Sequence, residues 1–189
     1  LLAAPPDPHL QLTARFFPNP RAVLRIATAV TAAVKRPVPF ACEIAAVFVA
    51  QMEELPAFFC CLSVVEQLVP HFLARPLWLD ALRLLLRHAD PDLASAPLDV
   101  PRLETMVLSL FSASLSLAET TRLWDYLFAR GVGHVVAAAA AVLLVNRRRL
   151  VAGTPREPLA LPPADQIVAV ANMLAVAAQP ELAKVIELL

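Results

Sequence analysis

The fold of this chain is indicated most clearly by one segment, SLAETTRLWDYLFARG at residues 116–131. Ser116 and Glu119 have the spacing of a capping box, in which each side chain accepts a hydrogen bond from a backbone N–H group of the first turn. Gly131 stands where a glycine would close the helix in a left-handed turn. We therefore expect one complete helix, with an apolar face formed by four large side chains that are spaced for contact: Leu123, Trp124, Leu127 and Phe128.

The rest of the chain also has a helical pattern. Its 189 residues are 59% hydrophobic, and 18 prolines against three glycines fall mostly between apolar stretches, where proline starts or stops a helix. No strand or hairpin pattern appears. We predict an all-α fold, an irregular multi-helix bundle, with helices at about residues 20–36, 40–52, 54–73, 77–88, 100–113, 116–131, 134–151, 164–178 and 180–189.

The length of the chain suits a single domain at residues 1–189. A proline-rich linker at 154–163 would join a main helical body at 1–153 to C-terminal helices at 164–189. Because the chain begins with Leu1 rather than methionine, we expect it to be a piece of a longer protein.

Charge and hydropathy exclude several classes of partner. Sixteen basic and 16 acidic side chains give a net charge of zero, which offers no electrostatic footprint for nucleic acid. The longest apolar run, residues 135–145, is 11 residues long, whereas a membrane span needs about 20. We expect a buried core helix there and a cytoplasmic protein, peripheral to membranes only through its partners. The three cysteines, Cys42, Cys60 and Cys61, should be buried reduced thiols.

Local clusters of polar residues offer little chemistry of their own. The four histidines are scattered, no cysteine pairs have metal-ligand spacing, and the three glycines form no phosphate loop, so we expect no metal and no cofactor. Asp90 and Asp92 are interpreted as helix-capping residues rather than an acid/base pair. Residues 147–149 are three arginines, which fit a favourable charge cluster in the last turn of a helix, or alternatively a contact with a partner protein or a phospholipid headgroup.

Ordered motifs give a more specific indication. Arg122, Trp124 and Asp125 form an R-x-W-D pattern in the segment quoted above, and residues 15–18 read Arg-Phe-Phe-Pro. Between them come a helix pattern at 40–52, an acidic turn followed by Ala-Phe-Phe-Cys at 53–60, and Met106 ahead of the run 108–125. Over roughly residues 13–150 these motifs resemble the TBC domain, the fold of GTPase-activating proteins for Rab GTPases, which act in vesicle trafficking.

The resemblance implies where the catalytic residues should be. The family's arginine finger, which neutralises charge on the transferred phosphoryl group, corresponds to Arg15, with Leu12 where an aspartate is usual. The family's glutamine, which positions the attacking water, falls near Pro39, and proline has no side-chain amide. Gln51, the nearby glutamine, lies at the far end of the following helix.

Arg15 and the R-x-W-D residues could also have purely structural roles. Arg15, beside two phenylalanines, also fits a surface arginine that stacks on an aromatic ring. The R-x-W-D residues are expected to be structural: Trp124 would fill the core, while Arg122 and Asp125, which can meet on an adjacent face, would tie the helix to a neighbour.

The resemblance leaves three functions open. The first is a Rab-binding module with weak or lost GTPase-activating activity and no intrinsic catalysis. The second is an active GTPase activator, acting in trans, that uses Arg15 as its arginine finger. The third is a structural scaffold among the subunits of a larger assembly.

Overall fold

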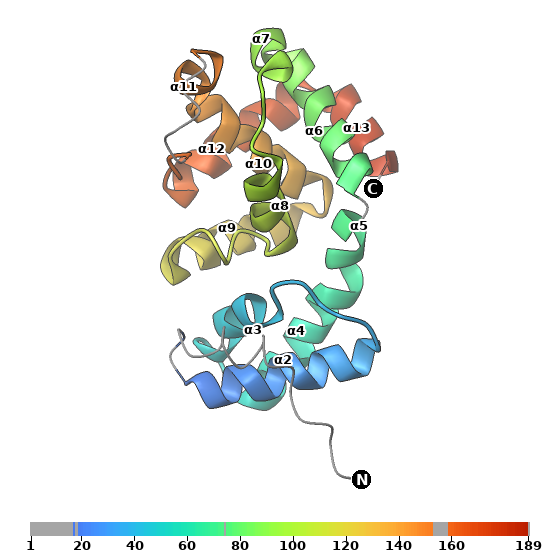
Figure 1. Ribbon diagram of the computed structural model, residues 1–189, viewed down its shortest axis with the longest axis vertical. Coiled ribbons are helices and arrows are strands. Elements are labelled where there is room, and N and C mark those ends of the chain that lie inside the picture. The colour runs from blue at the N-terminus through green and yellow to red at the C-terminus, as the bar shows by residue number, and fades with distance from the viewer. Residues whose placement is uncertain (1–16, 18, 74, 153–158, 189) are drawn as a thin grey trace. The chain divides into compact units, whose positions relative to one another are not determined.

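A computed structural model describes residue 17 and residues 19–73, 75–152 and 159–188. Over these residues the chain forms helices and contains no strand, which confirms the all-α fold (Figure 1). The chain divides into two compact units, Leu1–Pro70 (unit 1) and His71–Leu189 (unit 2). The single domain with a linker at 154–163 stays a prediction.

Three helices pack together in the described residues of unit 1, namely α2 (Pro20–Val34), α3 (Ala41–Val49) and α4 (Glu54–Gln67). Asn19 caps α2, its side-chain oxygen accepting a hydrogen bond from the Ala22 N–H at 3.4 Å, and Pro20 occupies the first turn. The buried stripe of α2 packs on α3 and α4, and most of α3 is buried. The core of unit 1 therefore lies where these three helices meet.

The helix predicted at 54–73 is two helices, because α4 ends at Gln67 and α5 (Val69–Leu73) follows. Pro70 lies in the first turn of α5, where its missing N–H costs nothing, whereas inside a continuous helix it would remove a backbone hydrogen bond. The predicted helices at 20–36 and 40–52 are each shorter in the structure.

Unit 2 is arranged around α10 (Gly133–Val145), whose side chains are buried from Val135 to Leu143. This confirms the core helix expected at 135–145. The helices that pack on it are α6 (Arg75–Ala89), α8 (Val100–Leu108), α9 (Leu117–Arg130), α12 (Ala164–Ala177) and α13 (Gln179–Leu188). The described residues of unit 2 also form the short helices α7 (Pro91–Ser95) and α11 (Arg147–Val151).

Two predicted helices of unit 2 were too long. The helix predicted at 100–113 ends at Leu108, and the helix predicted at 134–151 is interrupted at Asn146. The arginines at 147–149 therefore lie in the short helix α11 and not in the last turn of a long helix. Asp90 caps α7, as expected, accepting from the Leu93 N–H at 3.1 Å.

Charged residues at the start of α7 contact an arginine at the start of α11. Arg147 forms a salt bridge with Asp90 and lies 3.3 Å from Asp92. The hydrogen bond from Arg147, together with that from Leu93, holds the pKa of the Asp90 carboxyl below its usual value. In the part of the chain that the structure describes, no helix has the length and apolar character needed to cross a bilayer.

Candidate functional site

Helix α9 has the two ends that its sequence predicts, with one difference at each. The Ser116 hydroxyl accepts a hydrogen bond from the Glu119 N–H at 3.4 Å, which is half of a capping box. The Glu119 carboxylate does not complete the box, because it accepts from the Ala164 N–H and from Arg122. Gly131 has a positive φ of 88°, as expected, but its ψ of −177° is extended rather than left-handed helical.

The R-x-W-D residues of α9 occupy different environments. Trp124 is buried, with 3% of its surface exposed, and its indole Nε1 donates to the Leu110 carbonyl at 2.7 Å. Arg122 lies 3.4 Å from Glu119 and 4.0 Å from Asp165, whereas Asp125 is exposed. Trp124 thus links α9 to the turn that follows α8, and the ion partners of Arg122 belong to α9 and α12.

That turn has a geometry that the sequence did not indicate. Phe111 N–H donates to the Met106 carbonyl at 2.7 Å and Leu110 N–H to the Val107 carbonyl at 3.1 Å, the two bonds of a Schellman motif. Leu110, at φ 49°, occupies the left-handed position that usually holds glycine, and Phe111 follows at φ 69°. Both side chains are fully buried, so packing and the Trp124 bond offset the backbone strain.

The segment before α12 is fixed by three side chains from distant parts of unit 2. The Arg102 guanidinium donates to the Leu159 carbonyl at 2.8 Å. The buried Asn146 amide donates to the Ala160 carbonyl at 2.8 Å and accepts from the Ala160 N–H at 3.0 Å. With the Glu119 bond to Ala164, these contacts set the position of residues 159–164.

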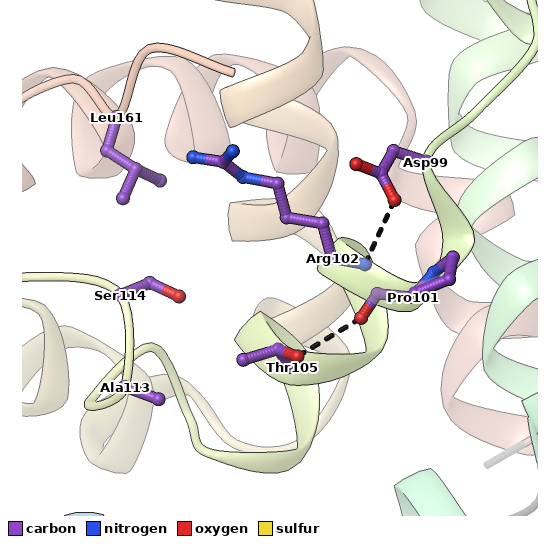
Figure 2. A pocket seen from close by; sticks show the side chains of 7 residues that line it. All are labelled: Asp99, Pro101, Arg102, Thr105, Ala113, Ser114 and Leu161. Atoms are coloured by element: carbon purple, nitrogen blue, oxygen red, sulfur yellow. Dashed lines mark hydrogen bonds between the residues drawn. The ribbon is translucent and has the colours of Figure 1, made fainter. Parts of the chain in front are cut away.

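A groove of 570 Å³ opens between these fixed segments (Figure 2). Its walls come from the start of α8, the turn after α8 and the segment before α12. Figure 2 shows the Arg102 guanidinium extending toward the Leu161 side of the groove, away from the Asp99 carboxylate. The residues that line it are Asp99, Pro101, Arg102, Thr105, Ala113, Ser114 and Leu161.

The groove is lined by both polar and apolar side chains. Its volume lies in the range of ligand sites, about 300–1,000 Å³. Arg102 contributes five N–H donors, of which one is used by Leu159. Asp99 is partly engaged as the cap of α8, accepting from the Arg102 N–H at 3.2 Å, and Thr105 and Ser114 contribute hydroxyls. A carboxylate facing Arg102 would gain a charge-assisted hydrogen bond.

Groups for covalent or metal chemistry are not assembled in the described residues. No group of three or more His, Cys, Asp or Glu side chains there could hold a metal ion. Cys42 and Cys61 are buried thiols, and burial is the main cause that raises the pKa of each to about 12. Such thiols are poor nucleophiles at neutral pH. Cys60 is only half-buried, unlike the prediction.

The residues that the sequence singled out fall in different parts of the chain. Arg15 and Leu12 lie outside the described residues. Pro39 is in the turn before α3, and Gln51 follows α3 with its amide donating to the Val47 carbonyl at 3.1 Å. Both belong to unit 1, whereas Arg122, Trp124 and Asp125 belong to unit 2.

The groove residues were not predicted as site residues from the sequence. Asp99 and Pro101 carry a recognisable helix-start signal, but that signal explains a cap and not a binding site. No local pattern distinguishes Arg102 from other arginines. In comparisons with known proteins, no family model matches the chain, and no curated protein or solved structure matches it.

Proposed function

We propose that the chain is a TBC-like helical module that binds a Rab-like GTPase, with weak or lost GTPase-activating activity. The observation that supports a binding role best is the open groove at Arg102, whose turn is held by Trp124 of the R-x-W-D helix. On this proposal the R-x-W-D helix serves as a frame, and Arg102 contacts an acidic side chain of the GTPase. The partner would bring the protein to vesicle membranes from the cytoplasm.

Two features favour weak or lost activation. Pro39, which stands where the resemblance places the glutamine, has no amide to hold the attacking water. The Gln51 amide hydrogen-bonds its own helix through Val47, so it is already engaged within unit 1. An arginine finger alone contributes about 10³–10⁵ in rate only when it is held in a preorganised geometry.

A direct test measures GTP hydrolysis and binding for a panel of Rab GTPases. We expect binding that depends on the bound nucleotide, and an acceleration of hydrolysis far below about 10³-fold. Binding should weaken in Arg102→Met and persist in the control Arg83→Met, which removes an exposed guanidinium on α6. Equal binding of all Rab proteins in both nucleotide states would contradict the proposal.

The same assay distinguishes the active alternative. Strong acceleration that is lost in Arg15→Ala and only partly restored by Arg15→Lys would show a working arginine finger, since lysine cannot reproduce the planar guanidinium. The binding-module proposal would then be wrong on activity, although not on the partner.

A structural scaffold is the second candidate, and exposed apolar side chains favour it. Leu55 and Phe59 of unit 1 are 67% and 59% exposed, and Met173 and Val176 of unit 2 are 64% and 80% exposed. Contiguous exposed apolar surface often marks a protein interface. A stable stoichiometric complex that survives removal of nucleotide and high salt would favour the scaffold over the GTPase-binding module.

A further inference from the structure

Helix α4 is apolar on two opposite faces, and only one of them is covered. α4 packs on α2 and α3 (Figure 1). Its inner face is formed by the buried residues Ala57, Cys61, Val64 and Val65. The opposite face carries Leu55, Phe59 and Leu62, at the spacing i, i+4 and i+7; we call these three residues the outer ridge. Large apolar side chains that gather on an exposed face often mark an interface. The outer ridge therefore has the character of an uncovered interface.

Two large apolar side chains of the outer ridge are mostly exposed to solvent. Leu55 is 67% exposed and Phe59 is 59% exposed, while Leu62 is half-buried. The Phe58 ring lies edge-on to that of Phe59, with centroids 5.2 Å apart, and supports it from the side. Side chains at i, i+4 and i+7 are the anchors by which one helix docks against another surface.

The segment of the chain that carries the outer ridge has charged side chains of one sign, although two arginines from outside the segment contact it. Residues 37–70 contain Glu43, Glu53, Glu54 and Glu66 and no lysine, arginine or histidine. Glu54 is paired with Arg25 of α2, and Arg36 donates to the Val65 carbonyl at 3.4 Å, next to Glu66 in the chain. The exposed carboxylates of Glu53 and Glu66 remain at the two ends of the outer ridge, and no ion pair engages them in the described part of the chain. A partner that covers the outer ridge can therefore pair its cations with these two carboxylates, beside its apolar contacts.

We propose that the outer ridge of α4 docks an amphipathic helix of a protein partner that is rich in lysine or arginine along the edges of its apolar stripe. This proposal is independent of the proposed binding of a Rab-like GTPase, because it is argued only from α4 and the charges near it. Phe59, the largest exposed side chain of the ridge, is the central anchor, and the carboxylates at the two ends set the orientation and the preference for a basic partner.

The test uses the full chain and a fluorescently labelled synthetic helix of about 18 residues, long enough to have some helicity alone. The peptide carries leucines at helical spacing, flanked by lysines, and a second peptide replaces each lysine with glutamate. We expect the lysine peptide to bind, with an affinity that falls as salt is raised, and the glutamate peptide not to bind.

Variants assign the binding to the outer ridge. Phe59→Ser should weaken binding of the lysine peptide at least about tenfold, as removal of a central anchor does. Phe59→Met keeps an apolar side chain and should retain most of the binding. The control Val176→Ser removes an even more exposed apolar side chain, on α12 of unit 2, and should leave binding unchanged.

Several results would overturn the proposal. They are equal binding of the two peptides, equal effects of Phe59→Ser and Val176→Ser, and self-association of the chain that Phe59→Ser abolishes, which would make a second copy the occupant. Circular dichroism of Phe59→Ser should match that of the wild type, because Phe59 lies outside the core. Peptide binding and Rab binding are separate measurements, so failure of one proposal leaves the other standing.

Discussion

In unit 2, buried side chains hydrogen-bond the backbone of segments far away in sequence, whereas the helices of unit 1 meet mainly through apolar side chains. Trp124 binds Leu110, and Asn146 binds Ala160, each across 14 residues. In unit 1, the long-range links between described residues include the exposed pair of Arg25 with Glu54 and a bond of 3.4 Å from Arg36 to the Val65 carbonyl. Unit 2 should therefore be sensitive to single polar substitutions that unit 1 tolerates.

The chain carries natural probes that follow the two units separately. Both tryptophans, Trp78 and Trp124, lie in unit 2, and all three cysteines lie in unit 1. Unfolding of unit 2 can thus be followed by tryptophan fluorescence, and unfolding of unit 1 by the reaction of its thiols with a chromogenic disulfide.

The largest effect is expected for Asn146→Ala. The substitution leaves the N–H and the carbonyl of Ala160 without the Asn146 amide, at a site where Asn146 is only 3% exposed. Losing these bonds should lower the free energy of unfolding of unit 2 by about 3 kcal/mol. Urea unfolding followed by tryptophan fluorescence measures the change.

A matched control for Asn146→Ala is Gln51→Ala. It also removes a side-chain amide, but one that donates to a carbonyl of the adjacent helix turn in unit 1. Thiol reactivity in urea should show little change for this variant. If the two variants lost equal free energy of unfolding, unit 1 would be as sensitive to the loss of a polar side chain as unit 2.

A smaller loss is expected for Trp124→Phe. Phenylalanine keeps an apolar ring in the core but removes the Nε1–H that donates to Leu110, and the buried carbonyl then loses its side-chain partner. We expect unit 2 to lose about 2 kcal/mol, from the lost bond and the smaller ring. Fluorescence of the remaining Trp78 reports the unfolding midpoint, and an unchanged midpoint would mean that the Leu110 turn does not depend on Trp124.

These two residues also show what the sequence could and could not predict. The starts of α2, α7 and α9 were predicted, because Asn19, Asp90 and Ser116 cap helices through bonds to residues three positions away. The ends of α8 and α10 were missed, since they are set by contacts that cross 14 residues. Local propensity favours continuing both helices, and only the folded unit supplies the competing partners.

The candidate site was beyond prediction for the same reason. Arg102 and Leu161 line one groove although they are far apart in the sequence, and three side chains must fix residues 159–164 before the groove exists. Arg15 and Pro39 were predicted as site residues instead, because they correspond to catalytic residues of the family that the chain resembles. The TBC-like interpretation stays a prediction.

Acidification should have a moderate effect on unit 2 through His134. Burial, and secondarily the charge of Arg130, lower the pKa of its imidazole, which packs edge-on to the Tyr126 ring at 5.6 Å. The unfolded chain takes up a proton near pH 6.5, whereas the folded chain does so only at lower pH. The stability of unit 2 should therefore fall as pH drops below about 6.5, and level off below the pKa of the folded state.

Comparison with His134→Phe isolates this contribution. The variant has no imidazole to protonate, so the midpoint of urea unfolding should change less between pH 7 and pH 5, by about the amount that His134 contributes. An identical pH dependence in the two proteins would show that His134 does not contribute to the acid sensitivity of unit 2.

The smallest effect is expected for the exposed ion pair of unit 1. The side chains of Arg25 and Glu54 are 59% and 45% exposed, and such pairs lose most of their attraction to solvent screening and to the ordering of long side chains. Neither Arg25→Gln nor Glu54→Gln should measurably shift the urea midpoint reported by the thiols of unit 1.

The pair nevertheless affects the charge next to the outer ridge. Arg25→Gln frees the Glu54 carboxylate, so the lysine peptide should bind somewhat more tightly to this variant. Glu54→Gln removes the carboxylate, so it should not strengthen binding of the lysine peptide. A large loss of stability in either variant would mean that unit 1 also depends on polar side-chain contacts. The two units would then not differ in the type of interaction that stabilises them.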